Sequence, residues 1–307
     1  MRLSALFAVF LAFLFAGCCS LPWGADALAV TPASSGSIAI ILPDVLLLDS
    51  DLSQAYSAIN GGQEIGDEMG ALLLGTGVDP RTVPKAVRFT ISENSGSMAY
   101  IFQDPPGISS AESALASSGA WERTEYGGHP VFRSASRHVS FVGGNIVAGD
   151  EAAVKAAINV KNGILRDVRE NYALMGMMGR LDQSAPAIIA SEMTPESRSS
   201  LSSLPGSLDY SGLSAIDSAG LELKRNSANI SIRLFFSIGT SEGRASFKSA
   251  AYEASTRLAS MAEEGGALKR LLNKIEVGED SECVTLSVET TGAEFRAAKQ
   301  EIDRAGP

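Results

Sequence analysis

The chain has 307 residues, a formal net charge of −10 and three cysteines. That length can bury a sizeable core in one large domain or in two of typical size. The acidic balance argues against nucleic acid and anionic lipid as electrostatic partners, because both would need clustered Lys and Arg. Without a C-x-x-C pair, three cysteines supply no disulfide framework, so the fold must depend on packing.

The first predicted element is an export signal. Arg2 is the only charge before the apolar run of residues 3–16, which ends at Gly17, Cys18 and Cys19. A run of this length is typical of the core of a secretory signal peptide. It is shorter than the roughly 20 residues that a membrane-spanning helix needs. We therefore expect export followed by cleavage.

Residues Phe15, Ala16, Gly17 and Cys18 resemble the lipobox of bacterial lipoproteins, in which a small pair precedes an invariant cysteine. The family usually has Leu at the position of Phe15. The resemblance implies removal of residues 1–17 and acylation of Cys18, so that lipid chains would hold the protein at the membrane. It covers only the signal segment and says nothing about the domain that follows.

Ordinary secretion is the alternative to lipidation. Cleavage after Ala27 or Ala29, both in small-x-small sites, would release a protein without lipid. Cys19 stands where enteric-type lipoproteins of the inner membrane carry aspartate. By that resemblance we expect the outer membrane and the periplasm if the source is Gram-negative.

Residues 18–37 are rich in Pro, Ala, Ser and Gly, which predicts an anchor followed by a flexible tether. A first folded half is expected over 38–163. Its predicted strands are 38–42, 86–92, 97–103, 121–126, 131–134, 138–142 and 145–148. Its predicted helices are two short ones within 52–74, then 109–118 and 151–160, the last with Asp150 as its N-cap.

A second half, 164–307, repeats a similar order of elements. Its predicted strands are 187–191, 220–223, 230–238 and 283–289, and its predicted helices are 166–181, 243–264 and one from about Thr291. The segments VAGDEAAVKAAI and VETTGAEFRAAKQEI both indicate a strand, a polar cap and an Ala-rich helix. We therefore predict an α+β fold of antiparallel sheets with helices packed on one face, built from two related halves or from halves alike by chance.

Residues 239–243 match G-x-S-x-G between a predicted strand and a predicted helix, the setting of a nucleophile elbow. The hydrolases that use this motif supply their histidine after the serine in the chain. Here His129 and His138 both precede Ser241. Capping of the helix by Thr240 or Ser241 explains the pattern better than catalysis does.

His129, His138 and Glu125 are the candidate metal ligands, because they flank one predicted strand-turn-strand. Their spacing matches neither an i, i+4 helical pair nor a tight H-x-H pair. A turn position for His129 and a strand start for His138 are therefore the preferred interpretation. No cofactor motif is present, and we predict neither a metal nor another cofactor.

Two further segments have a functional and a structural interpretation. The methionines of 172–178 could line an adaptable apolar groove, but a core helix face is the more usual use of such residues. Cys283 has no histidine after it, so a cysteine nucleophile is not supported.

The hypothesis from sequence is a lipid-anchored envelope protein, not an enzyme, that binds or scaffolds another envelope protein. One alternative is a ligand- or lipid-binding lipoprotein with an apolar cavity. A hydrolase or metalloenzyme is the other, and it requires His129 and His138 to lie within coordination distance of each other.

Overall fold

The computed structural model describes residues 25–60, 62–91, 96–135, 137–195 and 215–305. The predicted signal peptide, Cys18 and Cys19 lie outside the described residues, so cleavage and acylation stay predictions. Within the described ranges, no helix combines the length and the apolar character needed to cross a membrane.

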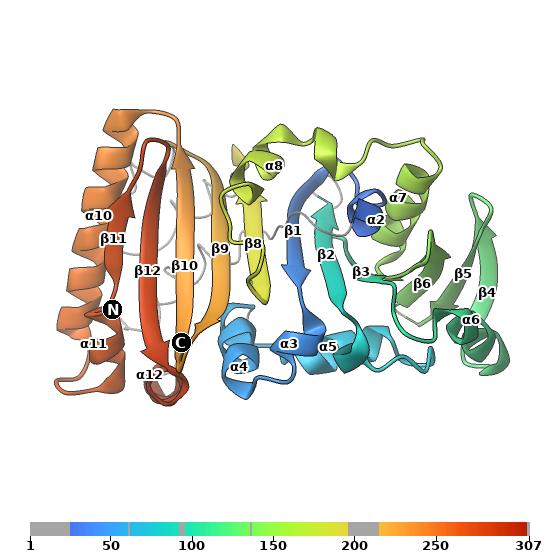
Figure 1. Cartoon of the computed structure of the whole chain (residues 1–307), viewed down its shortest axis with the longest axis horizontal. Helices are drawn as coiled ribbons and strands as arrows, with labels where there is room; N and C mark the ends of the chain where they lie inside the picture. The colour runs from blue at the N-terminus through green and yellow to red at the C-terminus, as the bar shows by residue number, and fades with distance from the viewer. Residues whose placement is uncertain (1–24, 61, 92–95, 136, 196–214, 306–307) are drawn as a thin grey trace.

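The described strands form one continuous twelve-stranded sheet in which every neighbouring pair is antiparallel (Figure 1). The order across the sheet is β11-β12-β10-β9-β8-β1-β2-β3-β7-β6-β5-β4. The strands are β1 Ser35–Ile41, β2 Lys85–Ile91, β3 Met98–Gln103, β4 Glu122–Tyr126, β5 His129–Ser134, β6 Arg137–Val142, β7 Asn145–Gly149, β8 Ala187–Glu192, β9 Ile216–Asn226, β10 Asn229–Ile238, β11 Glu276–Glu279 and β12 Cys283–Thr291. The predicted α+β class with antiparallel pairing is confirmed.

Helices cover both faces of this sheet. The α-helices are α2 Ala25–Leu28, α3 Pro43–Leu46, α4 Ser50–Ile59, α5 Ile65–Leu72, α6 Ile108–Ser117, α7 Glu151–Lys161, α8 Tyr172–Met178, α10 Ser241–Met261, α11 Ala267–Leu272 and α12 Gly292–Ala305. Two short 3₁₀ turns are η1 Pro80–Thr82 and η3 Val168–Glu170. We call the side packed against α2, α7 and α8 the α7 face, and the side packed against α4, α5, α6 and α10 the α10 face.

The prediction that helices lie on one face is wrong because the central strands are apolar on both sides. In β1, Ile38 and Ile40 pack on the α7 face, whereas Ala39 and Ile41 pack on the α10 face. Successive side chains of a strand point to opposite faces, so a continuous apolar run requires cover on each side. The sheet therefore forms the middle layer of three.

A similar order of elements occurs twice along the chain, although α3, α4, α5 and η1 lie between β1 and β2 without a described counterpart between β8 and β9. β1, β2 and β3 are followed by α6, by strands that end with β7 beside β3, and by α7. β8, β9 and β10 are followed by α10 and α11, by strands that end with β12 beside β10, and by α12. After α6 four strands follow, but after α10 only two, so the first half carries the hairpin β4–β5 in addition.

The two halves meet in the middle of the sheet. β1 pairs with β8 over residues 37–41 and 187–191, with Ala39 opposite Ile189 at the centre. Ion pairs add to this contact, because Asp49 at the N-terminus of α4 binds Arg225 of β9, with 2.6 Å between Oδ1 and Nη2. Asp51 of α4 pairs with Arg296 of α12. The proposed division at residue 163 thus separates two halves of one sheet.

Three local predictions are corrected by the structure. Residues 25–37 are not part of a flexible tether, because α2 packs on the α7 face and β1 begins at Ser35. The helix expected over 166–181 is divided into η3 and α8. Asp150 precedes α7 without capping it, since its carboxylate accepts a hydrogen bond from the backbone N–H of Met98.

Candidate functional site

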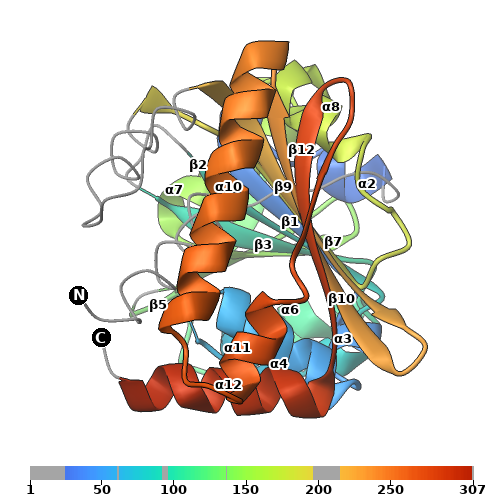
Figure 2. The ribbon, with the colours of Figure 1, turned by 90° about the vertical axis from the view of Figure 1, so that its left-hand side faces the viewer.

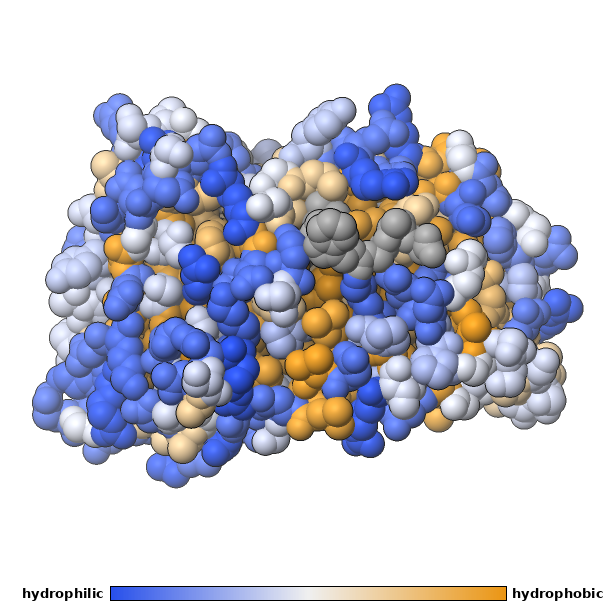
Figure 3. All heavy atoms as spheres, in the orientation of Figure 1, coloured by the Kyte–Doolittle hydropathy of each residue, from blue (hydrophilic) through white to orange (hydrophobic). Residues whose placement is uncertain are grey.

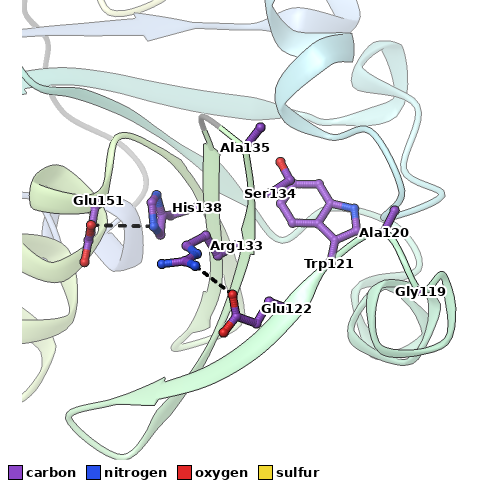
Figure 4. Close-up of a pocket in the computed structure, with 9 residues that line it drawn as sticks. All are labelled: Gly119, Ala120, Trp121, Glu122, Arg133, Ser134, Ala135, His138 and Glu151. Carbon is purple, nitrogen blue, oxygen red and sulfur yellow. Dashed lines mark ion pairs between the residues drawn. The ribbon is translucent and has the colours of Figure 1, made fainter.

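A polar cleft with a volume of about 610 Å³ lies at the β4 end of the sheet (Figure 4). The segment before β4, the strands β4, β5 and β6, and the first residue of α7 form its walls. Its charged and aromatic lining consists of Trp121, Glu122, Arg133, His138 and Glu151. Opposite charges and one large aromatic ring therefore face the same space.

The register of two hairpins brings three of these side chains together. Gly127 and Gly128 join β4 to β5 with φ values of +57° and +78°, which are the conformations of a two-residue type I′ turn. This turn sets Glu122 directly opposite Arg133. The β5–β6 ladder then sets Arg133 opposite His138. Directly opposite residues lie on the same face, so the three side chains form a row across neighbouring strands.

One ion pair and one polar contact hold this row in place. The Arg133 guanidinium lies 2.8 Å from the Glu122 carboxylate, and His138 Nε2 lies 3.8 Å from a Glu151 oxygen. Lys155, one helical turn after Glu151, donates to the other oxygen of that carboxylate at 2.6 Å. The hydrogen bond from Lys155 and its positive charge lower the pKa of Glu151. The cleft therefore keeps an ionised carboxylate beside the imidazole.

His138 is the most enclosed of the charged or titratable groups in the row, with 13% of its side chain exposed. Burial lowers its pKa below the usual value of 6.5, against the opposing effect of Glu151. The ring is therefore neutral at neutral pH. Its Nδ1 atom has no hydrogen-bond partner among the described residues, whereas Nε2 faces Glu151.

Trp121 forms the aromatic wall and is positioned by a glycine of the first half. A Cβ atom on Gly75 would lie 2.8 Å from the indole nitrogen, so a larger residue at 75 would collide with the ring. Gly75 also has a φ of +86°, a conformation that favours glycine. The loop after α5 therefore presses directly against the indole.

This arrangement is suited to recognition of a polar surface. Carboxylates offer acceptors, the guanidinium and the imidazole offer donors, and the indole offers apolar area. Ion pairs with Glu122 and Lys155 hold Arg133 and Glu151 in place before a partner arrives, which lowers the entropic cost of binding. The cleft is thus preorganised to bind a partner that carries both charged and apolar groups.

The candidate metal ligands do not converge. His129 lies beside the Gly127–Gly128 turn, opposite Tyr126, and its Nδ1 is 3.3 Å from the Phe141 carbonyl oxygen. His138 lies at the other end of the β5–β6 ladder, opposite Arg133. Among the described residues, no group of three or more His, Cys, Asp and Glu side chains is placed to hold a metal ion. The coordination distance that a metalloenzyme requires is therefore not present between these histidines.

Of the three candidate metal ligands, only His138 lines the cleft. Glu125 lies opposite Pro130 in the β4–β5 hairpin, and His129 is at the turn. Sequence reasoning did not identify Trp121, Arg133 or Glu151 as site residues. The Gly127–Gly128 turn was the available signal, because a two-residue hairpin implies the pairing of residue 122 with 133.

The G-x-S-x-G segment is a helix start. Thr240 is the N-cap of α10 and its hydroxyl accepts a hydrogen bond from Gly243 N–H at 3.1 Å. Ser241 is the first residue of α10 and is exposed. This confirms capping by Thr240, one of the two capping residues considered.

The methionine segment and Cys283 both belong to the core. Met177 and Met178 of α8 are buried on the α7 face, and a Cβ on Gly220 would lie 2.7 Å from the Met177 sulfur. The helix therefore lies close against β9 and leaves no groove beneath these two residues. Cys283 is buried in the same cluster, and its burial raises the pKa of the thiol.

Comparison with known proteins finds similarity in structure alone. No protein-family model and no curated protein matches the sequence. Crystal form I of TP0453 is similar with a TM-score of 0.49 and 8% identity, covering 91% of this chain and 98% of that one. Crystal form IV of TP0453 has a TM-score of 0.49 and 10% identity, covering 90% of this chain and 96% of that one.

Proposed function

We propose that the chain is exported, is held at the cell envelope by acyl chains on Cys18, and binds another envelope protein without catalysing a reaction. The preorganised cleft between β4, β5, β6 and α7 is the observation that carries the binding role. Its paired charges and its indole form a surface for a polar protein segment rather than for a lipid chain.

Burial of α2 supports cleavage before Cys18 over cleavage after Ala27 or Ala29. Ala27 is 0% exposed and Leu28 is 3% exposed, and both pack in the core of the α7 face. Cleavage at either later site would remove one or both of these side chains from the mature protein. Cleavage before Cys18 leaves the whole of α2 in place.

The distance from the anchor to the fold is short. Six residues lie between Cys18 and Ala25, where α2 begins. Fully extended, such a segment spans about 20 Å. Acyl chains on Cys18 would therefore keep the domain close to the bilayer, where an envelope partner is within reach.

Intact mass of the membrane-extracted protein tests the anchor. We expect a mature chain that begins at Cys18 and carries the mass of acyl chains. A Cys18→Ala variant should lose that mass and leave the membrane fraction. An unmodified N-terminus at Leu28 or Val30 would contradict lipidation.

Capture of a partner tests the cleft separately from the anchor. We expect that full-length protein in detergent recovers one envelope protein reproducibly, and that Arg133→Ala lowers recovery about tenfold by removing the guanidinium and leaving Glu122 unpaired. Arg169→Ala is the matched control, because Arg169 forms an exposed ion pair with Asp167 outside the cleft. Equal recovery by both variants would show that the cleft is not the binding site.

A further inference from the structure

The β4 end of the sheet carries an open strand edge. Residues 122–125 are exposed, and β4 is the last strand of the sheet at this end, with no described strand paired to its outer edge; α6 lies below it (Figure 1). An uncovered edge strand offers unpaired N–H and C=O groups to another strand. The outer edge of β4 can therefore accept a strand from another chain.

The turn decides which backbone groups of β4 point outward. Tyr126 and His129 flank the two-residue turn and form its hydrogen-bonded pair. Antiparallel ladders alternate, so Glu125 opposite Pro130 and Arg123 opposite Phe132 are non-hydrogen-bonded pairs. Pro130 fits this position because it has no N–H. The backbone N–H and C=O groups of Arg123 and Glu125 consequently point away from β5.

We propose that a second copy of this chain pairs its own β4 with this edge, antiparallel and with Thr124 opposite Thr124 of the second copy. The outward-pointing backbone N–H and C=O groups of Arg123 then form hydrogen bonds with those of Glu125 of the second copy. By symmetry, Glu125 forms the same hydrogen bonds with Arg123 of the second copy. Opposite charges face each other at both positions.

Charge selects this register over its neighbours. Outward-pointing residues must pair with outward-pointing residues, so the register can shift only in steps of two. One shift places Arg123 opposite Arg123 of the second copy, and the other places Glu125 opposite Glu125 of the second copy. Like charges directly opposite are destabilising. The sequence of β4 is therefore self-complementary in one antiparallel register.

The side chains are available for this pairing. Arg123 is 62% exposed, and its ion pair is a 3.4 Å contact with Glu112 of α6, which is itself 42% exposed. Exposed ion pairs of this kind contribute little, so Arg123 can exchange Glu112 for a new carboxylate. Glu125 is exposed on the same face of the strand, two residues further on.

The pairing also brings the second copy to the cleft. Glu122 lies on the opposite face from Arg123, together with Thr124 and Tyr126. In the proposed register, Tyr126 of the second copy is opposite Glu122, which forms one side of the cleft. A five-residue edge is a small interface, so the dimer is a weak one that a covalent trap should reveal.

Disulfide trapping tests the register in the full-length protein in detergent. Residues opposite each other in a non-hydrogen-bonded pair have Cα atoms about 4.5 Å apart, within the range of a disulfide. We expect Thr124→Cys to form a covalent dimer in about tenfold higher yield than Ser249→Cys, an exposed position on α10 at the other end of the sheet. Equal yields from the two variants, or no dimer above that of the parent chain, would overturn the proposal.

Reversing the charges at positions 123 and 125 in the Thr124→Cys variant distinguishes pairing with a second copy from pairing with another protein. Arg123→Glu and Glu125→Arg should each lower the yield about fivefold, because like charges then face each other twice. The double exchange should restore the yield, since the charges are again opposite. Single exchanges without effect, or a double exchange that stays low, would contradict self-pairing and would point to a peptide strand of another protein.

Discussion

The two ends of the sheet differ in what lies beside the outermost strand. At one end, α10 lies beside β11 (Figure 1), and it stands in front of the sheet when this end faces the viewer (Figure 2). Glu279 of β11 pairs there with Lys248 at 3.2 Å and with Arg244 at 3.8 Å. At the other end β4 is uncovered, and it belongs to the additional hairpin of the first half. The space-filling view in the orientation of Figure 1 shows mainly hydrophilic residues around this end, with isolated hydrophobic ones (Figure 3).

This difference suggests that one end of the sheet contributes mainly to the stability of the fold and the other mainly to binding of a partner. A long antiparallel sheet must protect both edges from unspecific pairing, either by covering them or by placing charges on them. At the β11 end, a helix that contributes to the core forms ion pairs with the edge strand, whose own residues are mostly exposed, whereas at the β4 end the edge strand carries exposed charges and has no such helix beside it among the described elements. The cleft lies at the β4 end. We therefore expect substitutions at the β11 end to affect folding, and substitutions at the β4 end to affect binding more than folding.

The largest effect is expected at the β11 end from Phe247→Ala. Phe247 is 5% exposed, and its ring lies 4.8 Å from that of Phe236 between the centroids. Removing the ring should lower the free energy of unfolding by about 3–5 kcal/mol. Urea denaturation of the full chain measures this. Tyr252→Ala, on the same helix but at a side chain that is 66% exposed, should lower the free energy of unfolding far less. Equal losses of unfolding free energy in the two variants would show that Phe247 does not anchor α10 at this end of the sheet.

An intermediate effect is expected where the first half supports the cleft. Gly75→Ala and Gly77→Ala both place a Cβ at positive φ, which costs about 1–2 kcal/mol. Only the Cβ at 75 meets Trp121, because nothing lies within 4 Å of the one at 77. The collision should add about 1–2 kcal/mol and weaken capture of the partner. Indistinguishable urea midpoints for the two variants would show that Trp121 moves freely.

The smallest effect concerns pH and His138 in the cleft. Its folded-state pKa lies below the usual 6.5 because of burial, so the unfolded chain takes up a proton first as the pH falls through that value. His138 should therefore reduce stability progressively below pH 6.5, down to its lowered pKa. His138→Gln should show a smaller decrease in the urea midpoint between pH 7.5 and pH 5 than the parent chain. A steeper decrease in the variant would contradict the direction of the shift.

Strong local patterns predicted most elements correctly. The apolar run before Pro43 became β1, and the segments on either side of residues 92–95 became the paired strands β2 and β3. The Gly61–Gly62 break separates α4 from α5. These signals work because turn residues and side-chain periodicity act over only a few residues.

Predictions failed where a local preference competed with distant contacts. Residues 25–37 have the composition of a linker, but Ala27 and Leu28 are small and apolar enough to pack against the sheet. Asp150 has the side chain of an N-cap, but its carboxylate accepts a hydrogen bond from the backbone N–H of Met98 on the neighbouring strand instead. β11 was not predicted, because its four residues acquire strand structure only by pairing with β12.

The sequence by itself determined the α+β class and most of the helices and strands, and it predicts an export signal that lies outside the described residues. Only the tertiary structure decided that β1 pairs with β8, that one sheet has helices on both faces, and that Trp121, Arg133, His138 and Glu151 share a cleft. The physical reason is the range of the interactions. Turns and periodicity depend on neighbours in the chain, whereas pairing between halves and the approach of α7 to β6 depend on burial of apolar faces far apart in sequence.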